Sequence, residues 1–150
     1  TKGVTMLKIL ALDPSGTGTT GVCLINSQII LTEFKSVNWK EHLTFIKGLV
    51  ETYQPALLLY ETTNYINSKG KDMTSLLKLI GAIESLAVKR IENILVHQVK
   101  DLKSKLFKGT KKIPDLTFKY GQGWFYDQKR ISLHELDAFL VYWLWKERNG

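Results

Sequence analysis

The sequence has one cysteine, Cys23, among its 150 residues, and no apolar run long enough to cross a membrane. One cysteine excludes an intramolecular disulfide, so we interpret Cys23 as a small buried strand residue and expect the reducing cytoplasm as the compartment. A membrane-spanning helix needs roughly 18 apolar residues, and no signal peptide is visible. Internal repeats and low-complexity linkers are absent as well. We therefore expect one globular domain over 1–150, with a disordered or tag-derived end at 1–5 and a variable insertion at 113–130.

Acidic residues are scarce too: 14 Asp and Glu face 21 Lys and Arg, which gives a net charge of +7. The excess is concentrated between His97 and Lys112, where Asp101 is the only acid among six lysines: Lys100, Lys103, Lys105, Lys108, Lys111 and Lys112. Such a cluster indicates a polyanionic partner, most often nucleic acid. A solvated basic loop is the alternative, and charge alone does not decide between the two.

Apolar patterning predicts the order of the elements. Short apolar runs predict strands at 6–13, 20–26, 28–34, 56–61 and 93–99, and helical spacing predicts helices at 39–53, 72–91 and 131–145. The stretch 113–130 has no helical period. Three consecutive strands followed by alternating helices and strands imply a mixed α/β sheet flanked by helices. The ribonuclease-H-like fold has this order, with a five-stranded sheet made of a three-strand antiparallel meander and two parallel strands.

Carboxylates stand at the ends of two of these strands. Asp13 ends the first strand, before the turn "PSGTGTTG", and Glu61 ends the strand "LLLYE". Asp137 lies in the first turns of the last helix and shares a helix face with His134, three residues earlier. Gathered carboxylates repel unless a cation compensates, and hard oxygen ligands select Mg²⁺ or Mn²⁺. On a basic protein the pattern indicates metal-assisted phosphodiester hydrolysis, although each acid alone also has an ordinary structural reading, such as Asp13 starting a turn.

The last helix combines this polar start with an apolar body. Its packing stripe is predicted to consist of Leu136, Phe139, Leu140 and Trp143. Glu135 points about 100° away from its neighbours on a helix, so we interpret it as negative charge that complements the helix dipole rather than as a site residue.

Taken in order, several segments resemble the RuvC family of Holliday-junction resolvases. "ILALDPSGTGTTGVCLI" is similar to that family's first strand, its aspartate-containing turn and its second strand, and "LLLYETT" to the strand that ends in the second catalytic acid. "HQVK" at 97–100 is similar to the family's Q-V-K, and "HELDAFL" to its closing motif in the version that begins with histidine. The resemblance spans about 6–112 and 131–145, and no single one of these motifs is decisive.

The resemblance implies a Mg²⁺-dependent endonuclease that resolves four-way DNA junctions in recombination and repair. Its catalytic and metal-binding set would be Asp13, Glu61, His134 and Asp137. Asp13 would be shared by two Mg²⁺ ions, for which Mn²⁺ can substitute, and Glu61 and Asp137 would each hold one side. His134 would either bind metal or position the attacking water. The compact chain would suit a phage, although nothing in the sequence proves that origin.

The family's DNA contacts carry over onto specific positions. Lys100 and Lys111 would bind phosphates near the scissile bond, and the other lysines of the cluster would add to this surface. An aromatic residue that follows the second acid stacks on a junction base in the family; Asn64 stands there in this chain, and neighbouring Tyr65 is the candidate replacement. Family members are homodimers, and the helix 72–91 is the expected dimer surface, although core packing accounts for most of its apolar stripe.

The stretch 113–130 departs from the family, which usually has a helix there. One interpretation is a DNA-contacting loop that mixes charge with stacking surface, through Lys119, Trp124, Tyr126, Lys129 and Arg130. The other is a hairpin-like excursion whose aromatic side chains pack on the domain. Two alternative functions also stay open: a nuclease for branched DNA generally or for RNA–DNA hybrids, and an ATP-binding domain like those of actin and the sugar kinases, to which "DPSGTGTTG" is similar.

Overall fold

A computed structural model describes residues 7–62 and 71–150, and its centre is a five-stranded sheet in the order β3-β2-β1-β4-β5. The first three strands form an antiparallel meander, and β4 and β5 run parallel to β1. The predicted mixed α/β sheet is therefore confirmed. The strand bounds are Ile9–Asp13 for β1, Thr19–Asn26 for β2, Gln28–Lys35 for β3, Leu57–Thr62 for β4 and Arg90–Leu95 for β5.

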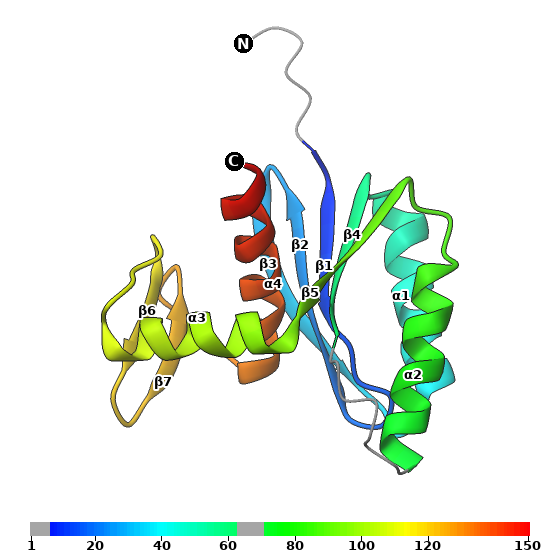
Figure 1. Ribbon diagram of the computed structural model, residues 1–150, viewed down its shortest axis with the longest axis horizontal. Coiled ribbons are helices and arrows are strands. Elements are labelled where there is room, and N and C mark those ends of the chain that lie inside the picture. Colours follow the sequence, from blue (N-terminus) through cyan, green and yellow to red (C-terminus); the bar gives the residue numbers. More distant parts are fainter. Residues whose placement is uncertain (1–6, 63–70) are drawn as a thin grey trace, which may run out of the picture.

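Helices cover both faces of this sheet, which produces three layers (Figure 1). α1 (Trp39–Tyr53) and α2 (Lys71–Glu84) lie on one face, and α4 (Leu133–Asn149) lies on the other. Strand side chains alternate between the faces, so in β1 Leu10 and Leu12 join the core under α1 and α2, whereas Ile9 and Ala11 join the core under α4. The same alternation directs Asp13 and Glu61, at the odd-numbered positions, towards α4.

The last helix begins at Ser132, which forms a reciprocal cap with Glu135. The Ser132 hydroxyl oxygen accepts from the Glu135 backbone N–H, and the Glu135 carboxylate accepts from the Ser132 backbone N–H. The interpretation of Glu135 as helix-end charge is therefore confirmed. Leu136, Phe139 and Leu140 are buried as predicted, and Ala138, Val141 and Tyr142 are buried beside them.

Cys23 is buried in β2, and burial raises the pKa of its thiol.

Two predicted boundaries are wrong. The strand predicted at 93–99 ends at Leu95, and a helix, α3 (Val96–Lys108), follows it without a loop. The helix predicted at 72–91 ends at Glu84. "NILVHQV" reads as one short apolar run, but Val99 and Leu102 are buried at helical spacing, and this period continues past the end of the run. The lysine cluster is thus carried largely by a helix rather than by a loop.

The stretch 113–130 contributes to a second, three-stranded antiparallel sheet, made of β6 (Leu116–Lys119), β7 (Gly123–Tyr126) and β8 (Lys129–Ile131). Its inner face packs on α4: Trp124 is buried, and the Tyr126 ring lies 5.0 Å from that of Phe139. Its cationic side chains Lys119, Lys129 and Arg130 are exposed. Packing therefore explains Trp124 and Tyr126, and the cationic side chains lie at the surface. Among the helices within residues 7–62 and 71–150, none has the length and apolar character needed to span a membrane.

Candidate active site

The two strand-end carboxylates meet at the carboxyl end of the central sheet. β1 and β4 are parallel neighbours, and their register pairs Leu12 with Tyr60, one residue before Asp13 and Glu61. Both acids also point to the α4 face, and their side chains share a hydrogen bond. Parallel pairing and strand alternation are thus enough to bring together two groups that are 48 residues apart in sequence.

The start of α4 reaches this point because β2 has a glycine opposite Asp13. Gly21 pairs with Asp13 across the sheet, and a Cβ placed on Gly21 would lie 1.9 Å from the carbonyl oxygen of His134. Only a residue without a side chain lets the helix backbone approach so closely. The Nδ1 atom of His134 lies 3.8 Å from Oδ2 of Asp13, and about half of the His134 side chain is exposed.

The α3 helix adds a cation to the site. Lys103 Nζ lies 2.6 Å from Oδ1 of Asp137, and both side chains are largely buried. Lys100 lies one turn earlier on the same face of α3, and both lysine charges act on the Glu61 carboxylate. Sequence reasoning placed Lys103 in the DNA-binding cluster and missed its contact with Asp137, because the first turn of α3 was taken for a strand.

Burial and mutual repulsion dominate the electrostatics of the acids. Burial, together with the charge of Glu61 and the hydrogen bond to it, raises the pKa of Asp13 to about 9; Asp137 adds to this rise and His134 opposes it. Burial also raises the pKa of Glu61, while the hydrogen bond from Asp13 and the charges of Lys103 and Lys100 lower it. Burial and mutual repulsion therefore favour the neutral form of Asp13 when no cation is bound.

The chemistry of this donor set suits a divalent cation, since three carboxylates and an imidazole are ligand types that such cations bind. As they stand, no three acidic, histidine or cysteine side chains within 7–62 and 71–150 converge as a ready metal site. Asp137 contacts Lys103, and the Asp13 and Glu61 side chains are hydrogen-bonded to each other. A cation would supply the positive charge that Lys103 supplies to Asp137 in the structure.

A buried polar network fixes the turn that follows Asp13. Thr20 Oγ1 accepts from the Ser15 backbone N–H at 3.0 Å and lies 2.8 Å from Nδ1 of His42, a fully buried residue of α1. The other ring nitrogen of His42 lies 2.7 Å from the carbonyl oxygen of Ser36. Sequence reasoning did not identify this network, because the lone histidine in 39–53 carries no signal of which strand residue it will meet. The network holds the turn beside the carboxylates in one arrangement.

Comparison with solved structures now places this arrangement among known folds. Thermus thermophilus RuvC in complex with a Holliday junction substrate is similar at a TM-score of 0.60 and 15% identity, over 97% of this chain and 97% of that chain. The yeast mitochondrial Holliday junction resolvase is similar at 0.52 and 12%, over 91% of this chain and 76% of that chain. The fowlpox virus Holliday junction resolvase is similar at 0.51 and 13%, over 95% and 99%.

The chain has the ribonuclease-H-like fold of these resolvases. Matches are confined to structure: no family model matches the sequence, and no curated protein matches it. At 12–15% identity, the similarity establishes the resolvase fold and leaves the chemistry to be argued from the site.

The remaining predicted DNA contacts are spread around this resolvase fold. Lys100, Lys108 and Lys112 are exposed, and Lys105 forms a surface pair with Asp101. Lys111 donates to both carboxylate oxygens of Glu147 at 2.8 Å. Glu147 is ten residues beyond Asp137 on α4, roughly 15 Å along the helix, so the position of Lys111 does not support a contact at the scissile bond. Asn64 and Tyr65 lie outside the described residues.

Proposed function

We propose that this protein is a metal-dependent endonuclease that resolves four-way DNA junctions. The observation that carries the proposal is the meeting of Asp13 and Glu61 at neighbouring parallel strand ends, with Asp137 and His134 brought over them by α4, on the fold of junction resolvases. The titles of the similar structures name Holliday junction substrates or resolvases. The net charge of +7 suits a polyanionic substrate.

In this proposal, two divalent ions, Mg²⁺ or Mn²⁺, would be held by Asp13, Glu61, Asp137 and His134. Bound metal would supply an activated water and would stabilise the charge that develops on the leaving oxygen. The chain's own contribution is to orient the carboxylates, through the strand register, the Gly21 contact and the network around His42. Lys100, exposed beside the site, binds a phosphate of the substrate strand.

The protein also acts as a homodimer in this proposal, with α2 as the contact surface. Leu77 is 57% exposed on α2, and Gly81, one turn later on the same face, has open space beyond it. The exposed Leu77 side chain offers apolar surface to a second helix, and Gly81 has no side chain to keep that helix at a distance. Two sites in one dimer would cut two strands of a junction symmetrically.

The test compares three substrates: a synthetic four-way junction, a linear duplex of the same sequence and an RNA–DNA hybrid, each with Mg²⁺, with Mn²⁺ and with EDTA. We expect paired, symmetric nicks in the junction only, and none in EDTA. Equal cutting of the linear duplex would contradict junction specificity. Preferential cutting of the hybrid would assign the site to RNA instead, and cleavage in EDTA would exclude the metal-dependent mechanism.

The contact between Lys103 and Asp137 leads to a separate prediction about metal binding. Because the Lys103 ammonium neutralises a carboxylate that the metal needs, replacing Lys103 with glutamine should strengthen the stabilisation by Mg²⁺ and lower the stability of the metal-free protein by about 1–3 kcal/mol, since Asp137 loses its partner. Thermal unfolding with and without Mg²⁺ measures both effects. Lys105→Gln, which removes an exposed surface pair from the same helix, is the matched control. Equal Mg²⁺-induced shifts in the two variants would contradict the competition.

A further inference from the structure

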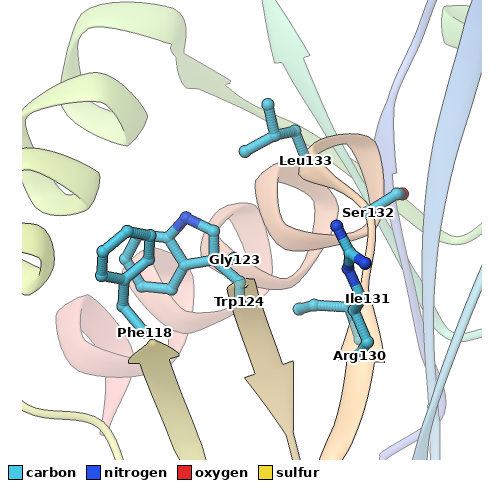
Figure 2. Close-up of a pocket in the computed structure, with 7 residues that line it drawn as sticks. All are labelled: Phe118, Gly123, Trp124, Arg130, Ile131, Ser132 and Leu133. Atoms are coloured by element: carbon cyan, nitrogen blue, oxygen red, sulfur yellow. The ribbon is translucent and has the colours of Figure 1, made fainter. Parts of the chain in front are cut away.

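An aromatic pocket lies next to the candidate site, between the small sheet and the start of α4. Its volume is about 610 Å³, and Figure 2 shows Phe118 and Trp124 together on one side, Arg130 and Ile131 on the other, and Leu133 beside them. The rings of Phe118 and Trp124 lie 5.0 Å apart. Leu133 is 58% exposed. The pocket thus offers apolar surface that nothing in the described chain covers.

The charge of this pocket is positive. Among the described residues, Arg130 is the only charged one that lines it, and it is exposed. A second hollow of about 650 Å³ shares Phe118 and Trp124 in its lining, which also includes Phe107, Lys112 and Asp115. Phe107 is 55% exposed, and its ring lies 4.9 Å from that of Phe118. Cations therefore flank a short series of aromatic rings, a combination that binds the bases and phosphates of single-stranded nucleic acid.

Residues that line the pocket are also next in sequence to residues of the candidate site. Arg130 is in β8, Ser132 caps α4, and Leu133 immediately precedes His134, whose ring lies 3.8 Å from Asp13. The pocket and the carboxylates therefore border the same end of α4. The pocket is large enough for one nucleotide and too small for a duplex, so only a base that has left its stack can enter.

We propose that this pocket binds one unpaired nucleotide of the DNA strand beside the cleaved bond, with the base against Phe118 and Leu133, a phosphate on Arg130, and buried Trp124 supporting Phe118 from below. The inference rests on the proposed nuclease function and adds to it a preference for substrates with an unpaired base next to the cut. The second hollow, with Phe107 and Lys112, receives the following nucleotide.

The test measures the affinity of the full chain for a labelled oligothymidylate and for a linear duplex, in EDTA so that no strand is cut. Arg130→Gln and Leu133→Ser should each weaken oligothymidylate binding by about fivefold or more and leave duplex binding unchanged. Arg130→Gln should also reduce the slope of log affinity against log salt by about 0.7, as expected for one lost phosphate contact on a single strand. A purely structural role for Arg130 would not change this slope.

Two matched controls remove the same kind of group elsewhere. Lys47→Gln removes an exposed cation from α1, and Leu7→Ser removes an exposed apolar side chain at the opposite end of β1 from Asp13. Neither should change binding. Ultraviolet crosslinking of an oligonucleotide that contains 5-iododeoxyuridine should mark peptides within 107–133; crosslinks confined to other peptides would overturn the proposal.

The outcomes separate this inference from the proposed function. If the wild-type protein cuts the four-way junction while both pocket variants bind oligothymidylate as the wild type does, the pocket proposal alone fails. Equal weakening of oligothymidylate and duplex binding would also overturn it, since a general phosphate contact would then explain the result. If the wild type cuts no junction, the proposed function fails, and the placement of a strand beside a cleaved bond fails with it.

Discussion

Replacing Asp13 with asparagine is expected to abolish cleavage and, in the same protein, to stabilise the metal-free fold at alkaline pH. Asparagine cannot supply the negative charge that a metal ion requires, so activity is lost. The effect on stability follows from the pKa of Asp13, which burial and Glu61 raise from 3.8 to about 9. Between these values the folded state binds a proton that the unfolded state has released, so stability falls as pH rises through this window.

Asparagine removes this proton linkage and can still donate to Glu61 in place of the protonated acid. The variant's advantage over the wild type should therefore grow with pH, by at most about 1.4 kcal/mol per pH unit for one proton. Urea unfolding in EDTA at pH 5 and pH 8 measures it. Asp127→Asn, which changes an exposed aspartate in the turn between β7 and β8, should show neither effect. Cleavage that survives Asp13→Asn would reject the catalytic assignment, and an equal loss of stability at both pH values would reject the strained carboxyl pair.

The position of the carboxylate pair could be predicted from the sequence because it depends on local patterns within each strand. Apolar runs that end in an acid mark the carboxyl ends of strands, and strand alternation decides which face the acid takes. Asp13 and Glu61 satisfy both rules, and the structure places them side by side. Their catalytic role remains a prediction, since geometry alone does not test it.

The contact between Lys103 and Asp137 could not be predicted in the same way. It depends on where α3 begins, and "NILVHQV" contains a strand end and a helix start with no glycine, proline or polar cap between them. A short apolar run of this kind fits both periods. The buried spacing of Val99 and Leu102 was the available signal, and it would have placed Lys100 and Lys103 on one face.

A hairpin-like excursion was one of the two interpretations of 113–130, but the third strand was not predicted, because the turn before it lacks the usual residues. Asp127 and Gln128 both have positive φ between β7 and β8, in a two-residue hairpin turn that normally shows Asn-Gly or Asp-Gly in the sequence. Asp115, before β6, also has a positive φ without being glycine. Packing of Trp124 and Tyr126 on α4 stabilises these positive-φ turn conformations, which local sequence propensity does not predict. The pocket beside Arg130 exists only in the folded arrangement of these turns.

Replacing Gly21 with alanine should disable the site without touching any of its charged groups. The new Cβ would lie 1.9 Å from the carbonyl oxygen of His134, a backbone contact that no change of rotamer relieves. Either β2 or the start of α4 must move, which should cost about 3 kcal/mol of stability. Since a displacement of about 1 Å at a catalytic group can reduce the rate about 100-fold, we expect a loss of cleavage of that size even where the protein remains folded.

A second glycine shows whether the position or the residue type causes the loss. Gly48, on the exposed side of α1, has nothing within 4 Å of an added Cβ, so Gly48→Ala should leave cleavage unchanged and stabilise the helix by up to about 1 kcal/mol. Circular dichroism and urea unfolding separate an unfolded Gly21→Ala protein from a folded, inactive one. In a folded variant, intact binding of the junction with lost cleavage would indicate that His134 and Asp137 have moved relative to Asp13. Wild-type stability and cleavage in Gly21→Ala would mean that the close approach of β2 and α4 does not position the site.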